Sequence, residues 1–478
     1  MKMIVRFLLS ITVVLALGAC IEDGFTTSPS DTPVFSTDIV DMGDVFTDET
    51  TPTSRILIHN RNSKSLLLSE ISLSGPDAEY FRINVDGSST PQGWNNLEIR
   101  GKDSVFVLIQ ATLPERGDLT DNFSAQLDVR TNGVVTSLPI VARGVNVTRL
   151  RAQTITSDTR LVADKPYQIY DSLVVAPGAT LTIDPGTTLC FHDKGELIVR
   201  GTLICEGTAE QPIVMTGDRT GNVVTDISFD IMSRQWTGVF FTRTSADNHM
   251  AYTVVKNTTQ GVTVSGDPEA DYSTRPQLTL LNSVLRNSAG CVLEAYRSGI
   301  KATGCEFAEA ADGLVYLQGG EYRFDQSTFA NNYLFAAISG PAVQFGEPAY
   351  DEEWDGDTDG LPASYIKAEF TNSILYGIGT ELSHGELEGC EIYFRNCLFK
   401  SKGDDDDNFI NCIWGEDPLY YTERLEYIFD YRLRPESPAI GKADGTLSGP
   451  EAAVDFYGNR RGSIPDLGAY VFTPPTED

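Results

Sequence analysis

The chain has 478 residues, enough for two or three domains, and carries 36 Lys and Arg against 67 Asp and Glu, a net charge of −31. So acidic a chain makes nucleic acid and anionic membrane surfaces poor partners. An anionic polysaccharide would also be repelled unless a divalent cation bridged it; alternatively, the acidic surface serves solubility alone.

Residues 1–20 form a predicted export signal. A basic start precedes an apolar run at 7–17 that is too short to span a bilayer, and Leu-Gly-Ala-Cys closes the segment. The closing motif resembles the lipobox of bacterial lipoproteins, which implies that Cys20 carries a lipid anchor. Glu22 and Asp23 resemble the export signal of surface lipoproteins in Bacteroidetes-type bacteria. We therefore expect an outer-membrane lipoprotein at the cell surface, with retention on the periplasmic leaflet as the alternative.

Residues 21–33, rich in Thr, Ser, Pro and Asp, are predicted to be a flexible tether. Residues 34–146 contain short alternating segments between turn-forming Asn and Gly clusters, which predicts an antiparallel β-sandwich. The order of Met-Gly-Asp-Val at 42–45, Leu-Ile-His-Asn at 57–60 and Tyr-Phe-Arg-Ile at 80–83 resembles Hydin-type immunoglobulin-like domains. That resemblance implies a spacer or adhesion module.

Residues 147–432 are predicted to form a right-handed parallel β-helix, so the whole chain is expected to be all-β. Its first part carries β-branched triplets between Pro-Gly corners, at 173–178 and 181–187. These phrases resemble the opening coils of many secreted bacterial β-helix proteins, whose fold is that of pectate lyases.

A recurring phrase carries the second part of this prediction. A Ser or Cys recurs between an Asn, Gly or Gln and a β-strand pattern, at Ser283, Cys305, Ser327, Ser373, Cys397 and Cys412, with spacings of 22, 22, 46, 24 and 15. We interpret the 46-residue step as two coils of about 23. A fixed period in this range predicts a stacked solenoid of roughly ten coils, in which like residues lie over like. Thr253 aligns with the same column 30 residues before its first Ser.

The cysteines other than Cys20 number seven and lie between 190 and 412. Cys305, Cys397 and Cys412 stand in the recurring column, which predicts that they are small buried residues of the stack. A disulfide between Cys397 and Cys412 is a further option, and no Cys or His spacing indicates zinc.

Residues 433–478 are predicted to be a C-terminal cap segment and tail. Asp-x-x-Gly-Asn-x-Arg at 455–461 and Asp-x-Gly-Ala-Tyr at 466–470 resemble the closing segment of such β-helix proteins. A solenoid needs a cap over its last apolar coil and open edge, so we expect Arg460 and Asp466 to be structural rather than catalytic.

The most specific candidate for a functional site is an acidic insertion that contains Asp355, Asp357 and Asp359 before Gly360. Carboxylates at alternate positions resemble the start of calcium loops and predict a Ca²⁺ site. Ile366 stands where such a loop carries its Glu, so a solvated acidic loop is the alternative. The Asp run at 404–407 is less specific.

Catalysis is a second possibility, because many β-helix proteins degrade polysaccharides. The basic residues of a lyase are available on suitable coils at Arg286, Arg297, Lys301 and Arg323. The sequence motifs of polygalacturonases are absent. The most similar stretch is the one around His384, and we expect His384 to be a surface histidine. Aromatic residues could stack on sugars or pack the last coil against the cap, and we favour packing; these are Trp354, Trp414, Tyr420, Tyr421, Tyr427 and Tyr431.

The sequence therefore predicts a surface lipoprotein whose β-helix acts as a non-enzymatic glycan-binding, adhesion or structural module. The alternative is a polysaccharide-degrading enzyme, foremost a cation-dependent lyase. Its expected partners are the membrane, through the lipid on Cys20, and a polysaccharide or another surface protein.

Overall fold

The computed structural model describes residues 24–89, 94–224, 227–267, 269–346, 366–382 and 391–474. The chain divides into two compact units, Met1–Asn146 and Val147–Asp478. Cys20, the candidate calcium ligands Asp355, Asp357 and Asp359, and also Trp354 and His384 lie outside the described residues. In the described part, no helix is long and apolar enough to cross a membrane.

The first unit consists of two sheets that share one hydrophobic core. The smaller sheet has the order β1 (Val34–Phe35), β3 (Ser54–His59), β7 (Ser104–Ala111) and β5 (Phe81–Val85). The larger has the order β2 (Val40–Phe46), β9 (Val134–Val145), β8 (Thr120–Thr131), β4 (Leu66–Ser74) and β6 (Leu97–Ile99). One short 3₁₀ helix, η1 (Ala78–Tyr80), precedes β5. Alternate residues of the longer strands, such as β7 and β8, are buried, so the two inner faces form a β-sandwich core.

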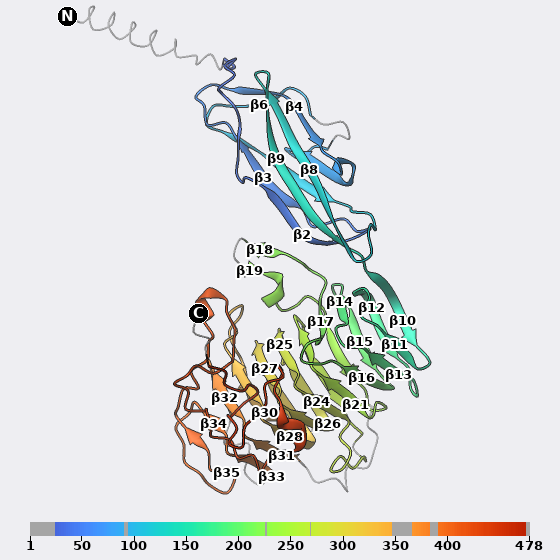
Figure 1. Cartoon of the computed structure of the whole chain (residues 1–478), viewed down its shortest axis with the longest axis vertical. Coiled ribbons are helices and arrows are strands. Elements are labelled where there is room, and N and C mark those ends of the chain that lie inside the picture. Colours follow the sequence, from blue (N-terminus) through green and yellow to red (C-terminus); the bar gives the residue numbers. More distant parts are fainter. Residues whose placement is uncertain are drawn as a thin grey trace, which may run out of the picture. The chain divides into compact units, whose positions relative to one another are not determined.

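The second unit is a parallel β-helix, so the all-β prediction is confirmed (Figure 1). Each coil contributes to three faces. The first face contains parts of β10 (Thr148–Ile155), β12 (Tyr167–Val175), β26 (Leu293–Thr303) and β28 (Val315–Asp325), with β15 (Glu196–Val199), β20 (Gly238–Phe241), β23 (Val262–Ser265) and β30 (Val343–Gly346).

The long strands β26 and β28 bend into the second face. Its other strands are β11 (Thr159–Leu161), β13 (Thr180–Ile183), β16 (Thr202–Glu206), β21 (Asn248–Ala251), β24 (Leu278–Leu281), β31 (Ile366–Thr371), β33 (Glu391–Arg395) and β35 (Phe409–Ile410).

The third face begins with the first halves of β10 and β12. It continues through β14 (Thr188–Phe191), β17 (Ile213–Gly217), β22 (Thr253–Lys256), β25 (Val284–Ser288), β27 (Glu306–Ala310), β29 (Thr328–Asn331), β32 (Ile374–Gly377), β34 (Leu398–Phe399) and β36 (Ile413–Trp414). A hairpin of β18 (Asn222–Val224) and β19 (Ile227–Ser228), followed by η2 (Phe229–Ile231), interrupts the early coils.

The strand register reproduces the recurring column. Val254 pairs with Val284, Val284 with Glu306, and Glu306 with Thr328, so Thr253, Ser283 and their successors stack coil upon coil. One detail of the prediction is wrong: Thr328 pairs directly with Ile374, so the 46-residue step is a single coil. Part of its extra length lies in the connection between β29 and β30, and the rest falls at 347–365, outside the described residues.

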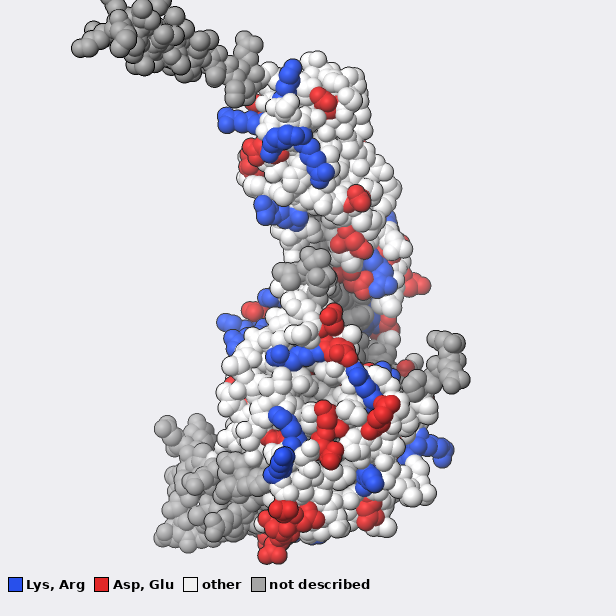
Figure 2. All heavy atoms as spheres, turned by 90° about the vertical axis from the view of Figure 1, so that its left-hand side faces the viewer, with Lys and Arg blue, Asp and Glu red and all other residues white. Residues whose placement is uncertain are grey.

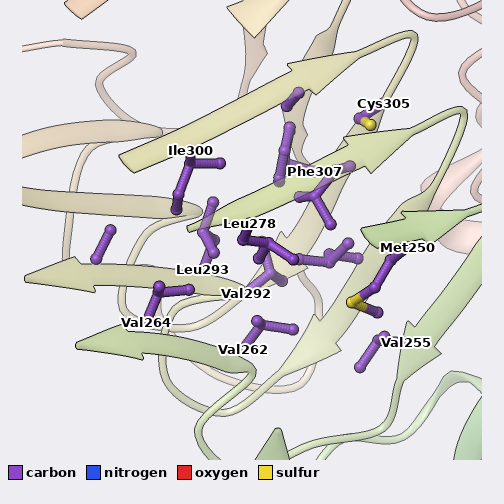
Figure 3. Close-up of a cluster of buried hydrophobic side chains, with 14 of the residues drawn as sticks. Met250, Val255, Val262, Val264, Leu278, Val292, Leu293, Ile300, Cys305 and Phe307 are labelled. Carbon is purple, nitrogen blue, oxygen red and sulfur yellow. The ribbon is translucent and has the colours of Figure 1, made fainter. Parts of the chain in front are cut away.

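The interior is filled by ladders of like side chains. In the earlier coils Met250, Val262, Leu278 and Ile300 point into one aliphatic cluster (Figure 3). In the later coils Phe324, Phe370, Phe394 and Phe409 stack with ring centroids 4.8, 4.6 and 5.1 Å apart. Such offset stacks add to the free energy of burial, so each coil positions the next.

The corner before the third face uses a left-handed backbone conformation in successive coils. Asn282, Gln326, Asn372 and Asn396 have φ values of 43°, 49°, 51° and 56°, and Gly304 takes the same place with φ 68°. Asn and Gly tolerate this region best, which explains the predicted Asn/Gly/Gln column. The amide of Asn396 donates to the side-chain oxygen of Asn372 at 3.0 Å, so the corner is also a hydrogen-bonded ladder.

The Ser and Cys side chains of the column are buried, apart from Cys412 of the last coil, which is partly buried. The hydroxyl of Ser283 accepts a hydrogen bond from the Thr253 N–H at 3.0 Å and donates to carbonyls of its own coil and the preceding one. Cys397 and Cys412 are free thiols, as are the other cysteines of the described ranges, so the optional disulfide is not formed. Burial raises the pKa of the Cys305 thiol to about 12.

Residues after β36 pack along the outward side of the third face, over several coils. Ala308, Ala330, Ile374 and Leu398 face outward there, and they form one core with residues such as Tyr420, Tyr431, Leu467 and Tyr470. The backbone N–H of Ala469 donates to the Thr328 hydroxyl at 2.9 Å, and that of Gly468 to the Asn372 carbonyl at 2.8 Å. Two 3₁₀ helices, η5 (Arg424–Glu426) and η6 (Pro450–Ala453), belong to this segment. The segment therefore covers the side of the stack, not the last coil alone.

The carboxylates of the two C-terminal motifs, Asp455 and Asp466, hold the turns of this segment. Asp455 is fully buried and accepts backbone hydrogen bonds from Tyr457, Asn459 and Val471 at 2.8 to 2.9 Å. Asp466 accepts from the N–H groups of Gly441 and Phe472. The arginine that points inward is Arg461, which donates to the Ala469 carbonyl at 2.7 Å, whereas Arg460 is exposed.

Candidate functional site

A pocket of about 380 Å³ lies where the third face meets the C-terminal segment. We call it the third-face pocket. Its floor comes from β22, β25 and β27, and one side comes from η2 with Asp230. The rest comes from the segment at 427–431 and from the residues around Tyr457 and Tyr470. All these elements belong to the second unit.

The parallel register places charged side chains on the floor in neighbouring coils. Lys256 is in register with Arg286, and the Val254–Val284 row continues to Glu306. Side chains at these positions point away from the interior, because the intervening residues Val255 and Leu285 belong to the hydrophobic core. The floor therefore presents two cations and one carboxylate to the pocket.

Glu306 is the most buried charged residue of the pocket, with 3% of its surface exposed. The Tyr470 hydroxyl donates to its Oε2 at 2.6 Å, and Arg286 Nη1 lies 3.5 Å from its Oε1. Burial raises the pKa of Glu306, while the Arg286 charge and the Tyr470 hydrogen bond act in the opposite direction. Arg286 is itself fixed by donating from Nη2 to the Phe429 carbonyl at 3.0 Å.

Glu309 lies behind this pair and is 1% exposed. It accepts hydrogen bonds from the Tyr431 hydroxyl and from the Asn332 N–H, the latter at 3.1 Å. Burial raises its pKa to about 7, against the hydrogen bond from Tyr431 and the charge of Arg286. Glu306 and Glu309 thus join the β-helix to the C-terminal segment through buried polar contacts.

Aromatic rings and paired charges form the walls. Tyr457 is 52% exposed, with its ring 5.5 Å from that of Tyr470 and 5.3 Å from that of Phe456. Lys256 is paired with Asp230. Asp430 pairs with Arg432 at 2.6 Å. The pocket therefore combines amphipathic rings with hydrogen-bonding groups.

The basic residues predicted for a lyase do not meet in one place. Arg286 lies on the third face, whereas Lys301 and Arg323 lie on the second face beside a smaller hollow of about 140 Å³. There Lys301 is paired with Glu451, and Arg323 lies 3.2 Å from Glu369. Arg297 is outside both hollows. Over the β-helix part of Figure 2, basic and acidic residues are interspersed.

The candidate aromatic residues have different roles. Tyr420 and Tyr431 are buried in the core beneath the C-terminal segment, and Trp414 stacks on Phe399 at 4.7 Å, as the packing interpretation expects. Tyr427 lines the pocket, with its ring stacked at 6.4 Å on that of Phe335. Tyr421 lies under Arg434.

Two carboxylates of the acidic run at 404–407 accept hydrogen bonds from residues that follow closely in the chain. Asp405 accepts hydrogen bonds from the Cys412 N–H and the Trp414 indole, and Asp406 from the Asn408 and Phe409 N–H groups. In the ranges that the structure describes, no three His, Cys, Asp or Glu side chains gather closely enough to hold a metal ion.

Sequence reasoning missed Glu306, Glu309, Tyr457 and Tyr470. One signal was present: Glu306 follows a column residue, at a place where the other coils carry apolar residues or threonine, namely Val284, Thr328, Ile374, Leu398 and Ile413. A charged residue in that row is costly unless it has a partner, and it therefore marks a special site.

Comparison with known proteins supports the fold. Residues 153–229 match the family model of the pectate-lyase-like β-helix domain. A stretch of 50 residues is 46% identical to Protein bark beetle of Drosophila melanogaster; it covers 10% of this chain and 2% of that protein. The chain thus spans a small fraction of the curated relative that it matches.

Solved structures give weak similarities. A family 123 glycoside hydrolase from Clostridium perfringens, described for glycolipid glycan hydrolysis, aligns with a TM-score of 0.18 at 10% identity, over 26% of this chain and 29% of that chain. The catalytic domain of a family 87 α-1,3-glucanase in complex with nigerose aligns with a TM-score of 0.16 at 10% identity, over 77% and 88% of the two chains. The coil register shows a parallel β-helix, and within it residues 153–229 match a pectate-lyase-like β-helix domain.

Proposed function

We propose that this protein is a bacterial surface lipoprotein whose β-helix binds a carbohydrate in the third-face pocket. The observation that carries the proposal is the pocket itself, which combines a volume of about 380 Å³ with exposed Tyr457, other aromatic rings and a charged floor. Sugars present apolar C–H faces and a rim of hydroxyl groups, and such sites match both.

The membrane anchor and location belong to the same proposal. The lipobox-like motif ending at Cys20 supports lipidation, and the following Glu22 and Asp23 support surface display over the periplasmic leaflet. The β-sandwich then serves as an immunoglobulin-like spacer between the lipid and the β-helix. Calcium, bound by Asp355, Asp357 and Asp359, is proposed as a stabilising ion of the insertion in the 46-residue coil.

Binding without cleavage is the favoured activity, because each carboxylate of the pocket already has one partner within the fold. Glu306 is bonded to Tyr470, and Asp430 is paired with Arg432. One observation favours a polysaccharide-degrading enzyme as second candidate: Glu306, a carboxyl of raised pKa, and Asp430 line the same pocket. Two carboxyl groups on one sugar are what glycoside hydrolysis requires. A cation-dependent lyase would instead use the basic residues.

The test combines binding and turnover on the full chain in detergent. A panel of plant, host and bacterial polysaccharides is offered with calcium or with chelator, while bound glycan, new reducing ends and unsaturated uronate absorbance are followed. Binding without products, lost in Tyr457→Ala but retained in Tyr393→Ala on the second face, is the expected result. Products with any glycan would establish the enzyme instead, and no binding to the whole panel would overturn the proposal.

The anchor is tested separately in bacterial cells by metabolic labelling with a radioactive fatty acid. Wild type is expected to incorporate label, and Cys20→Ala is expected to incorporate none. Protease treatment of intact cells should degrade a surface-displayed β-helix, and protection until the outer membrane is opened would favour the periplasmic leaflet.

A further inference from the structure

We infer that the third-face pocket selects neutral sugar residues, and that Glu306 and Arg286 recognise their hydroxyl groups. This inference rests on the carbohydrate-binding function proposed above and names its ligand class. It depends on two observations: the pairing of the pocket's charges and two buried polar atoms on its floor.

The first observation is that the cations of the pocket already have carboxylate partners. Among the described residues that line it, the basic side chains are Lys256 and Arg286. Lys256 is paired with Asp230, and Arg286 lies against Glu306 and the Phe429 carbonyl. A uronic acid would bring a further carboxylate to a site that also contains Asp430, and no lining cation of the described ranges remains to neutralise it. The pocket therefore disfavours anionic sugars.

The second observation is an adjacent acceptor and donor without hydrogen bonds. Glu306 Oε1 and Arg286 Nε are buried and have no hydrogen-bond partner, although both side chains line the pocket. Glu306 Oε1 keeps only the ion pair with Arg286 Nη1 at 3.5 Å. Buried polar atoms without hydrogen bonds are rare in folded proteins, so each calls for an explanation, and a bound ligand group provides one. Because Tyr470 satisfies Oε2, the acceptor that remains is Oε1.

A hydroxyl group matches this pair better than the other polar groups of sugars. It donates a hydrogen bond to Glu306 Oε1 and accepts one from Arg286 Nε through the same oxygen atom. A carboxylate only accepts and an ammonium only donates, so either would leave one of the two atoms unsatisfied. The hydroxyl rim of a neutral hexose or pentose thus fits the floor.

The aromatic wall fixes the orientation of such a sugar. Tyr457 offers the most exposed ring of the pocket, and its neighbour Tyr470 is the residue that holds Glu306. A sugar ring stacked on Tyr457 would therefore direct a hydroxyl edge toward the carboxylate. Stacking on Tyr457 and hydrogen bonding to Glu306 would then occur in the same bound sugar.

The experiment is isothermal titration of the full chain with cellotetraose, mannotetraose and xylotetraose, and with tetragalacturonate at the same ionic strength. We expect at least one neutral oligosaccharide to bind at least tenfold more tightly than tetragalacturonate. Glu306→Gln and Tyr457→Ala should each weaken that binding at least tenfold. Glu381→Gln, which changes a buried carboxylate bonded to Ser401, should not. Thermal melts verify that the variants are folded, and exposed Tyr457 gives a readout even if Glu306→Gln destabilises the chain.

The other outcomes separate this inference from the proposed function. Tetragalacturonate bound equally or better, and lost in Tyr457→Ala, would overturn the neutral selectivity while leaving a carbohydrate-binding pocket. Neutral binding that Glu306→Gln leaves unchanged would mean that ordered water satisfies the two floor atoms, and the assigned recognition would be wrong. Silence with every oligosaccharide and with the wider polysaccharide panel would overturn both.

Discussion

Replacing Glu309 by Gln is expected to change how the stability of the β-helix depends on pH. Glu309 is 1% exposed, and its carboxylate faces the Tyr431 hydroxyl, the Asn332 N–H and, among charged neighbours, Arg286 and Glu306. Gln keeps the volume and one oxygen acceptor of the protonated acid but does not titrate. The variant therefore behaves like the wild type at acidic pH and differs from it where Glu309 would ionise.

The magnitude follows from the pKa of Glu309, which burial raises from 4.5 to about 7. Between these values the folded chain holds a proton that the unfolded chain has lost. The wild type therefore loses stability as pH rises through this window, and the loss is complete above the folded pKa. At ~1.4 kcal/mol per pKa unit, the difference amounts to about 3 kcal/mol.

The assay is denaturant unfolding at pH 4.5 and pH 8 for wild type, Glu309→Gln and the exposed control Glu416→Gln. Other buried carboxyls of raised pKa, such as Glu294 and Asp325, make the same contribution to the pH dependence of stability in all three proteins. Their contribution therefore cancels when the variants are compared with wild type. The stability of Glu309→Gln relative to wild type should rise by about 3 kcal/mol from acidic to alkaline pH. Parallel profiles for wild type and variant would refute this account of the buried carboxyl.

Three further outcomes are expected. Phe370→Ala, which removes the ring between Phe324 and Phe394, should lower the free energy of unfolding by roughly 3–5 kcal/mol in denaturant titration. The buried Cys305 thiol, with its pKa raised to about 12, should resist alkylation at pH 8 in the folded chain and react after unfolding, as peptide mass spectrometry would record. Saturating calcium should raise the melting temperature of wild type, with about 2.7 kcal/mol gained at a hundredfold excess over Kd, and Asp357→Ala should abolish the gain.

Each of these outcomes has its control. Leu425→Ala, at a side chain that is 80% exposed, should change stability by less than about 0.5 kcal/mol. Rapid alkylation of Cys305 without denaturant would contradict the tight packing of its column. Asp404→Ala should keep the calcium effect, and an equal effect in wild type and Asp357→Ala would remove the insertion from the calcium hypothesis.

The stacking of the coils was predictable because a parallel β-helix repeats its chemistry in space and in sequence alike. Asn372, for example, occupies a left-handed corner that few residue types tolerate, so the recurring Asn phrase revealed the turn. The 46-residue coil was misread because spacing along the chain does not distinguish two coils from one coil with insertions. Only the direct pairing of Thr328 with Ile374 makes that distinction.

The third-face pocket could not be assembled from local motifs. Glu306 meets Tyr470 across 164 positions and Glu309 meets Tyr431 across 122, so neither pair leaves a short pattern. The C-terminal motif was recognised, but its residues specify only the turns around Asp455. They do not indicate the surface on which the segment packs. The side chains that form the pocket walls therefore became visible only with the packed segment in place.

The lateral packing of the C-terminal segment also bears on how the chain folds. A stack with contacts only between neighbouring coils can fray one coil at a time from its end. Here the last residues hold outward-facing Ala308, Ala330 and Ile374 from three different coils at once. Those coils are thereby linked into one cooperative unit that is complete only when the final part of the chain has arrived. During folding, the third face stays uncovered until the residues after β36 pack on it.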